Sequence, residues 1–144
     1  MEAGNLFPDF RVTEAGGRIV TRDSLRGKPA IVWFTTTYCV PCQIGAQRVA
    51  ALDDELGGGA FNVLVLFVDP REPVSDLVSW RSRFANEDWL VALDADLALT
   101  QQMELRFLDT KFLLDPEGAI EDVDVNIADN EYLSRIKEAV EEAS

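Results

Sequence analysis

The sequence predicts an α/β domain in which a central mixed sheet is flanked by helices. Two apolar segments, Ala30–Thr35 and Phe61–Val68, have the composition of strands that are buried on both faces. Each is followed by a segment with helical spacing of apolar residues, at about 41–56 and 74–84. With 144 residues, of which 47% are hydrophobic, the chain can bury a substantial core. We therefore expect residues 1–144 to form a single domain.

The elements before and within the first half follow from local signals. Segments 10–12 and 18–21 enclose Glu14-Ala15-Gly16-Gly17, which predicts an N-terminal hairpin. In the first helix the apolar residues Ile44, Val49, Leu52 and Leu56 have helical spacing, and a run of three glycines ends it.

The second half adds further elements. A strand near 89–92 and a short helix near 97–105 form a central strand-helix insertion. Two strands, 111–114 and 119–125, flank a turn with proline and glycine and predict a hairpin. A final helix at about 130–142 has Asp129 as its expected N-cap.

The only two cysteines, Cys39 and Cys42, lie between the first core strand and its helix. A helix N-terminus carries partial positive charge and lowers the pKa of a nearby thiol from about 8.5 towards roughly 3.5 to 7.5. Cys42 is about one helical turn further on, where it can attack a mixed disulfide formed at Cys39. The pair is thus predicted to be a redox couple with Cys39 as nucleophile and Cys42 as resolving thiol.

Other interpretations of the pair are weaker. Structural zinc needs four ligands, but the chain has no second cysteine pair and no histidine, so no metal site is assigned. A purely structural disulfide would close so small a loop that it would constrain the unfolded chain little. Two inert core cysteines are disfavoured because the pair lies at the end of an element, where function concentrates.

The charge of the chain limits its partners. A formal net charge of -13 disfavours nucleic acid and anionic membrane surfaces, whereas protein thiols or disulfides remain suitable partners. No segment approaches the roughly 20 apolar residues of a membrane span, and no signal peptide is visible. A monomer without cofactor is expected. An export signal or anchor could have been removed ahead of Met1, so an extracytoplasmic location is slightly favoured over a cytoplasmic one.

Several motifs together resemble one family. In chain order they are Phe7-Pro8-Asp9-Phe10, Leu25-Arg26-Gly27-Lys28-Pro29, the cysteine pair, Val65-Leu66-Phe67-Val68-Asp69 and Phe112-Leu113-Leu114-Asp115-Pro116-Glu117-Gly118. The chain resembles the TlpA-like branch of the thioredoxin superfamily, which includes ResA-like and CcmG-like cytochrome c maturation proteins. The resemblance implies a thioredoxin fold and thiol:disulfide exchange with protein substrates. It also implies an exposed Cys39 and a buried Cys42, with Tyr38, Val40 and Pro41 lining the site.

One departure from the family lies before the strand at 111–114. Relatives carry a cis-proline there, facing the cysteines, whereas this chain has Asp109 between Leu108 and Thr110. A non-proline cis bond costs about 2.5 to 4 kcal/mol, so we expect a trans peptide. These three residues are expected to line the site. Asp109 is either a plain turn residue or a carboxylate that raises the pKa of Cys39.

Two acid positions of the family are also empty. The buried carboxylate of thioredoxins falls on Trp33, and the one often found in TlpA-like proteins falls on Gly45. The acceptor of the Cys42 proton is therefore water, Asp109 or a group that the sequence does not identify.

Two alternative functions remain open. The thiolates suit Cu(I), and Asp109 adds an oxygen that could ligate or orient the ion; however, Thr110 stands where Sco-type copper proteins have a histidine. A thiol peroxidase is the other alternative. Thr36 and Cys39 fit the peroxiredoxin pattern, but Val32 replaces its proline.

Overall fold

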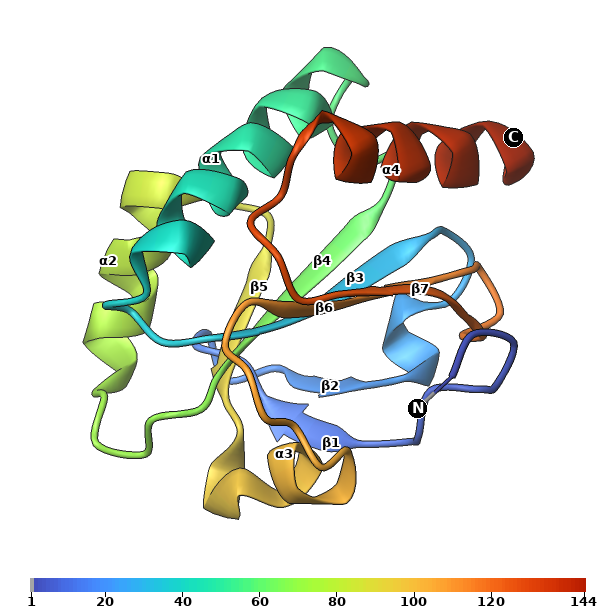
Figure 1. The fold of residues 1–144 in the computed structure, drawn as a ribbon. Helices are drawn as coiled ribbons and strands as arrows, with labels where there is room; N and C mark the ends of the chain where they lie inside the picture. The colour runs from blue at the N-terminus through green and yellow to red at the C-terminus, as the bar shows by residue number, and fades with distance from the viewer. Residues whose placement is uncertain (1) are drawn as a thin grey trace.

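The computed structural model describes residues 2–144 and is built around a five-stranded mixed sheet (Figure 1). The strand order is β5-β4-β3-β6-β7. The central strand β3 (Ala30–Thr35) pairs in parallel with β4 (Asn62–Phe67) and antiparallel with β6 (Thr110–Leu114). The edges are β5 (Leu90–Leu93), parallel to β4, and β7 (Ile120–Asp124), antiparallel to β6.

Helices and a hairpin cover the two faces of this sheet (Figure 1). One face is covered by α1 (Val40–Glu55), α2 (Val74–Phe84) and α4 (Asn130–Glu142). The other face is covered by the hairpin of β1 (Arg11–Thr13) and β2 (Ile19–Thr21), and by the short helix at residues 98–102. The chain thus has the thioredoxin fold that the sequence predicts, with the added N-terminal hairpin and the central insertion.

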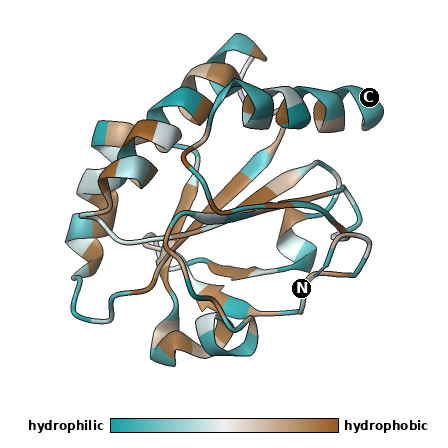
Figure 2. Cartoon of the chain, viewed as in Figure 1, coloured by the Kyte–Doolittle hydropathy of each residue, from teal (hydrophilic) through white to brown (hydrophobic). Residues whose placement is uncertain are grey.

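The central strand shows why the sheet is buried on both sides. Every residue of β3 is buried, and its side chains alternate between two hydrophobic cores. Ile31 and Trp33 belong to the core beneath the three long helices, whereas Val32 and Phe34 face the hairpin. Figure 2 shows the same layering, with hydrophobic residues concentrated in the central strands and hydrophilic residues along much of α4.

Most predicted elements are confirmed to within one or two residues, and β3, α2 and α4 begin and end at the predicted residues. The predicted cap is confirmed as well, because the Asp129 carboxylate accepts a hydrogen bond from the Tyr132 N–H at 2.9 Å. One apolar residue of the helical spacing in α1 does not face the core: Ile44 is 39% exposed, because the small residues Gly45 and Ala46 take the inward positions.

The short helix predicted at 97–105 was wrong in its extent. A 3-10 turn at Ala95–Leu97 precedes α3 (Ala98–Gln102), and Asp96 and Leu97 both have left-handed backbones. The Asp94 carboxylate accepts hydrogen bonds from the N–H groups of Leu99 and Thr100, which fixes this tight start. Within residues 2–144, no helix combines the length and the apolar composition that crossing a bilayer requires.

Candidate active site

The cysteine pair lies where the central strand ends and α1 begins. Cys39 is the N-cap of α1, and its carbonyl accepts a hydrogen bond from the Gln43 N–H at 3.1 Å. Pro41 follows within the first turn, where helix N–H groups have no intrahelical partner. Cys42 lies in the same turn, and the two cysteines form a disulfide with their Cα atoms 5.3 Å apart. The local sequence therefore places both sulfurs at the positive end of the helix dipole.

The exposure of the two cysteines differs, but less than expected. Cys42 is fully buried, and Cys39 is only 9% exposed rather than an open nucleophile. The residues on either side of Cys39 take the exposed positions instead: Tyr38 is 60% and Val40 58% exposed. Cys39 is thus the more accessible sulfur, set between two projecting side chains.

The loop after β4 contacts Tyr38 through an acid. Asp69 accepts a hydrogen bond from the Tyr38 hydroxyl at 2.9 Å, and Arg71 binds the same carboxylate through two nitrogens at 2.8 and 2.9 Å. These Arg71 hydrogen bonds, followed by the Tyr38 bond, hold the pKa of Asp69 below its ordinary value. The hydrogen bond to Asp69 in turn raises the pKa of Tyr38.

A second acid of this loop contacts the preceding residue. The Glu72 carboxylate is largely buried and accepts hydrogen bonds from the Thr37 N–H, at 3.0 and 3.3 Å, and from the Thr37 hydroxyl. Together with Asp69 it makes a clamp of two acids on the residues directly before Cys39. We call Asp69 and Glu72 the carboxylate clamp.

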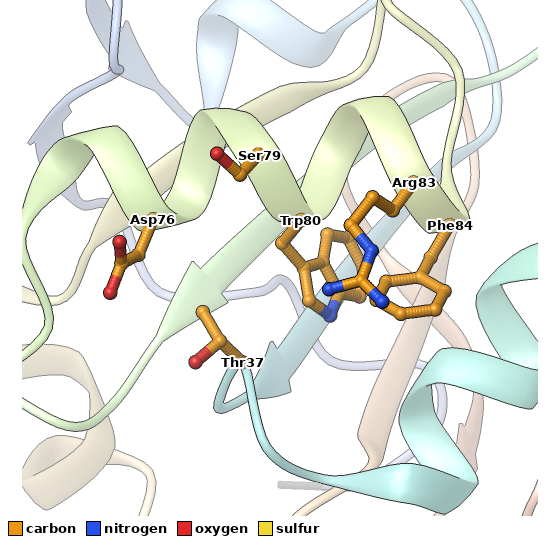
Figure 3. Close-up of a pocket in the computed structure, with 6 residues that line it drawn as sticks. All are labelled: Thr37, Asp76, Ser79, Trp80, Arg83 and Phe84. Carbon is orange, nitrogen blue, oxygen red and sulfur yellow. The ribbon is translucent and has the colours of Figure 1, made fainter.

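A cavity lies beside Thr37, between this segment and α2 (Figure 3). It has a volume of about 230 Å³ and is lined, besides Thr37, by Asp76, Ser79, Trp80, Arg83 and Phe84 of α2. Leu108, 40% exposed, lines a separate apolar cavity of about 160 Å³.

Asp109 occupies the position of the missing cis-proline, and every peptide bond in residues 2–144 is trans, as expected. Its backbone is left-handed, with φ 68°, and its N–H donates to the Phe34 carbonyl at 3.0 Å. The neighbouring Thr110 is buried and its hydroxyl donates to the Phe107 carbonyl at 2.6 Å. Asp109 is therefore a turn residue in its backbone, as the simpler of the two interpretations holds.

The side chain of Asp109 has a further role. It is buried, and one of its oxygens accepts hydrogen bonds from the Trp33 indole N–H at 2.9 Å and from the Lys111 ammonium at 3.1 Å. Lys111 is fully buried on β6 and lies 3.5 Å from Asp124. Burial raises the pKa of Asp109, and the charge of Lys111 opposes that shift.

Trp33 and Gly45, the two positions at which the resemblance implies an acid, pack against each other. A Cβ atom on Gly45 would lie 3.4 Å from the Trp33 ring and 3.3 Å from the backbone and Cβ of Ala128. Glycine therefore allows α1 to approach the indole closely, and the indole N–H extends to Asp109. A buried carboxylate near the first core strand is present, but it comes from the turn before β6 rather than from β3 or α1.

The metal interpretation loses its third ligand. Within the part of the chain that the structure describes, no three histidine, cysteine or acidic side chains are grouped so that they could hold a metal ion. Asp109 instead binds Trp33 and Lys111. One oxygen of Asp109 is thus occupied, and the role of this carboxylate in ligating or orienting an ion stays a prediction.

Asp69, Glu72 and Lys111 were not found from the sequence. Asp69 directly follows an apolar run and Lys111 directly precedes one, whereas Glu72 lies in a polar segment without such a signal. Most of their hydrogen-bond partners are distant in sequence. Asp69 binds Tyr38 across 31 positions, Glu72 binds Thr37 across 35, and Lys111 binds Asn126 across 15. The bonds of Asp69 with Arg71 and of Lys111 with Asp109 are the short-range ones.

Comparison with known proteins shows the family of the chain. The family model described as Redoxin matches residues 2–143. The thiol:disulfide interchange protein DsbE of Pseudomonas fluorescens biotype C is 25% identical over 146 residues, covering 97% of this chain and 79% of that protein.

Solved structures show the same fold. The thioredoxin domain of a thiol-disulfide oxidoreductase from Bacteroides vulgatus has a TM-score of 0.82 at 17% identity, over 97% of this chain and 99% of that one. A secreted disulfide oxidoreductase of Mycobacterium tuberculosis, homologous to DsbE of E. coli, has a TM-score of 0.71 at 20% identity, over 92% and 95%. With its thioredoxin fold and its Cys39–Cys42 disulfide, the chain belongs to the Redoxin family and is a thiol:disulfide oxidoreductase.

Proposed function

We propose that the chain exchanges disulfides with protein substrates, with Cys39 as the attacking thiol and Cys42 as the resolving thiol. The observation that supports this assignment most directly is their placement at the start of α1. Cys39 is the N-cap and retains some exposure, whereas Cys42 is fully buried one turn of helix away. A substrate sulfur can therefore reach Cys39 first, and Cys42 is protected from outside attack.

The exchange balances in two steps. The Cys39 thiolate attacks a substrate disulfide, which forms a mixed disulfide and releases one substrate thiolate. The Cys42 thiolate then attacks the Cys39 sulfur, which closes the Cys39–Cys42 disulfide and releases the second substrate thiolate. The protein loses two electrons and the substrate gains them. The reverse sequence oxidises a substrate dithiol.

Asp109 is the group we propose for the Cys42 proton. One of its oxygens is occupied by Trp33 and Lys111, but the other is buried without a hydrogen-bond partner in residues 2–144. Its raised pKa brings it closer to that of a thiol, which favours proton transfer. Asp109→Asn should slow release of a trapped mixed disulfide most at low pH, where few Cys42 thiolates are present. An unchanged pH profile would exclude this role.

The context of the reaction is a further part of the proposal. Residues 1–144 act as a single thioredoxin-like domain and as a monomer, with Tyr38, Val40, Pro41 and Leu108 lining the site. Cytochrome c maturation is the process that the resemblance to CcmG-like proteins and the similarity to DsbE favour.

Alkylation of the reduced protein tests the assignment of the cysteines. Brief treatment with iodoacetamide, followed by peptide mass spectrometry, should place the label at Cys39, because its sulfur is the accessible one. The oxidised protein serves as control and should not be labelled. Cys42→Ser should trap substrates as mixed disulfides, whereas Cys39→Ser should not. Dominant labelling at Cys42 would reverse the two roles.

A further inference from the structure

Glu72 holds the backbone that leads into the nucleophile. It lies in the loop between β4 and α2, is 8% exposed, and accepts hydrogen bonds from both the N–H and the hydroxyl of Thr37. On the other side of the same residue, the Gln43 amide donates to the Thr37 carbonyl at 2.8 Å. Both polar groups of the Thr37 backbone are therefore bound by side chains from other segments, two residues before Cys39.

Glu72 also differs from the other acids near the site in having no cationic partner. Asp69 is paired with Arg71, and Asp109 is paired with Lys111. Glu72 forms no ion pair with any residue from 2 to 144. Its hydrogen bonds from Thr37 are its polar contacts in this part of the chain. It is thus a largely buried carboxylate whose charge is not compensated by a neighbouring cation.

Other charged groups surround the segment from each element beside it. In the same loop these are Asp69 and Arg71, and on α2 they are Asp76 and Arg83 at the cavity next to Thr37. At the start of β6 they are Asp109 and Lys111, beside Asp124 of β7 and its partner Arg135. The pairs in the loop and on β6 largely cancel at a distance. Asp76 and Arg83 are exposed, so solvent screens them. The charge of Glu72 is the one that neither a partner nor solvent cancels.

We propose that Glu72 is a positioning residue of the redox site, which fixes the Thr37–Cys39 segment and, through its charge, disfavours the Cys39 thiolate. This inference rests on the proposed function in which Cys39 is the nucleophile. Two residues span at most about 7 Å, so the carboxylate and the Cys39 backbone are close enough for a like-charge effect. The effect opposes the α1 dipole, which stabilises the thiolate.

The consequence is a less acidic nucleophile and a more strongly reducing pair. A disfavoured thiolate raises the free energy of the reduced form relative to the disulfide, so the dithiol gives up its electrons more readily. Glu72 thus has two roles in one contact, because the carboxylate that orders the Thr37–Cys39 segment also carries the negative charge.

Glu72→Gln separates the charge from the hydrogen bond. Glutamine keeps the size and the acceptor oxygen, so the Thr37 contact can persist while the charge is lost. In a Cys42→Ser background, which leaves Cys39 as the single thiol, a thiolate absorbance titration should show a Cys39 pKa lower by about one unit. Alkylation at neutral pH should be about threefold faster, because a larger fraction of Cys39 is ionised. The gain is smaller than the increase in thiolate, because the intrinsic reactivity of a thiolate falls as its pKa falls.

Two matched variants define what the charge does. Glu55→Gln makes the same change at the far end of α1, about 22 Å along the helix axis, and should leave the titration unchanged. Gln43→Ala removes the opposite tether of Thr37 without changing any charge. It should lower stability but leave the Cys39 pKa near that of the parent.

Arg71→Gln tests whether an added uncompensated negative charge near Cys39 has the opposite effect on its pKa. Arg71 is exposed, so the variant should fold, and it leaves Asp69 without its cation. The Cys39 pKa should then rise. Equal Cys39 titrations in Glu72→Gln and its parent, or in Glu72→Ala and its parent if Glu72→Gln does not fold, would overturn the inference. Labelling of wild-type protein at Cys42 would instead overturn the proposed function, so the two failures are distinguishable.

Discussion

Lys111→Met is expected to destabilise the oxidised protein strongly. The Lys111 ammonium is fully buried and donates to the Asp109 side chain at 3.1 Å, to the Asp109 carbonyl at 2.8 Å and to the Asn126 carbonyl at 2.6 Å. It also lies 5.2 Å from the Trp33 ring centre. Methionine fills a similar volume but donates no hydrogen bond.

The magnitude follows from what the substitution leaves behind. The Asp109 carboxylate would remain buried without its cation, and breaking a buried ion pair in this way typically costs about 3 to 5 kcal/mol. Most single domains are stable by about 5 to 15 kcal/mol, so the variant should still fold. Urea unfolding followed by circular dichroism at pH 7 measures the loss.

The stability deficit of Lys111→Met should depend on pH, and the pKa of Asp109 determines its direction. Burial already raises the folded pKa of Asp109 above its ordinary value, and without Lys111 that pKa rises further. A carboxyl with a raised folded pKa contributes stability below its unfolded pKa and loses it as pH rises through the folded value. The deficit of Lys111→Met should therefore be largest near pH 7 and should shrink as the pH is lowered towards 5.

Two controls make the test specific. Lys137→Met removes an exposed lysine of α4 and should change stability by less than about 0.5 kcal/mol. The double variant Lys111→Met, Asp109→Asn removes both charges and should recover part of the loss. A deficit of less than about 1 kcal/mol at pH 7, or one that is the same at pH 5 and pH 7, would refute the reasoning.

Three further predictions concern other positions. Gly45→Ala should lower the unfolding free energy by about 1 kcal/mol, because crowding against Trp33 and Ala128 outweighs the gain in helix propensity; a variant more stable than wild type in urea would contradict this. Asp53→Ala should destabilise the protein by about 2 to 3 kcal/mol, since the buried indole N–H of Trp89 loses its acceptor at 3.0 Å. Thermal unfolding measures the loss, with Asp54→Ala as the control. Reduced wild type and Asp109→Asn should bind Cu(I) equally in competition with a chelator, because Asp109 belongs to no group of metal-ligating side chains in residues 2–144; weaker binding by the variant would restore it as a ligand.

Asp109→Pro, the variant that would restore the proline of the family, is unsuited to that last comparison. The Asp109 backbone has φ 68°, whereas proline requires a φ near −65°. The Asp109 N–H also donates to the Phe34 carbonyl, and proline has no such donor. Asparagine is preferable because it tolerates the left-handed region.

The sequence by itself determined the elements whose signals are local. β3 is a short apolar run, and α4 begins at Asp129, whose side chain caps the residues that directly follow it. The redox pair is also local, because Cys39 and Cys42 are one helical turn apart and both lie at a strand-to-helix junction. Such features depend on residues within a few positions of one another, so the order of residues is enough to predict them.

Only the tertiary structure decided how the site is supported. Thr37 and Glu72 meet across 35 positions, and Trp33 and Asp109 across 76. Contacts of this kind depend on the β5-β4-β3-β6-β7 strand order, which places the end of β3 between the loop after β4 and the start of β6. Periodicity in the sequence records which residues share a face, but it does not record which distant charge will be buried beside them. The sequence therefore determined the redox chemistry, and the packing of the sheet determined which acids surround it.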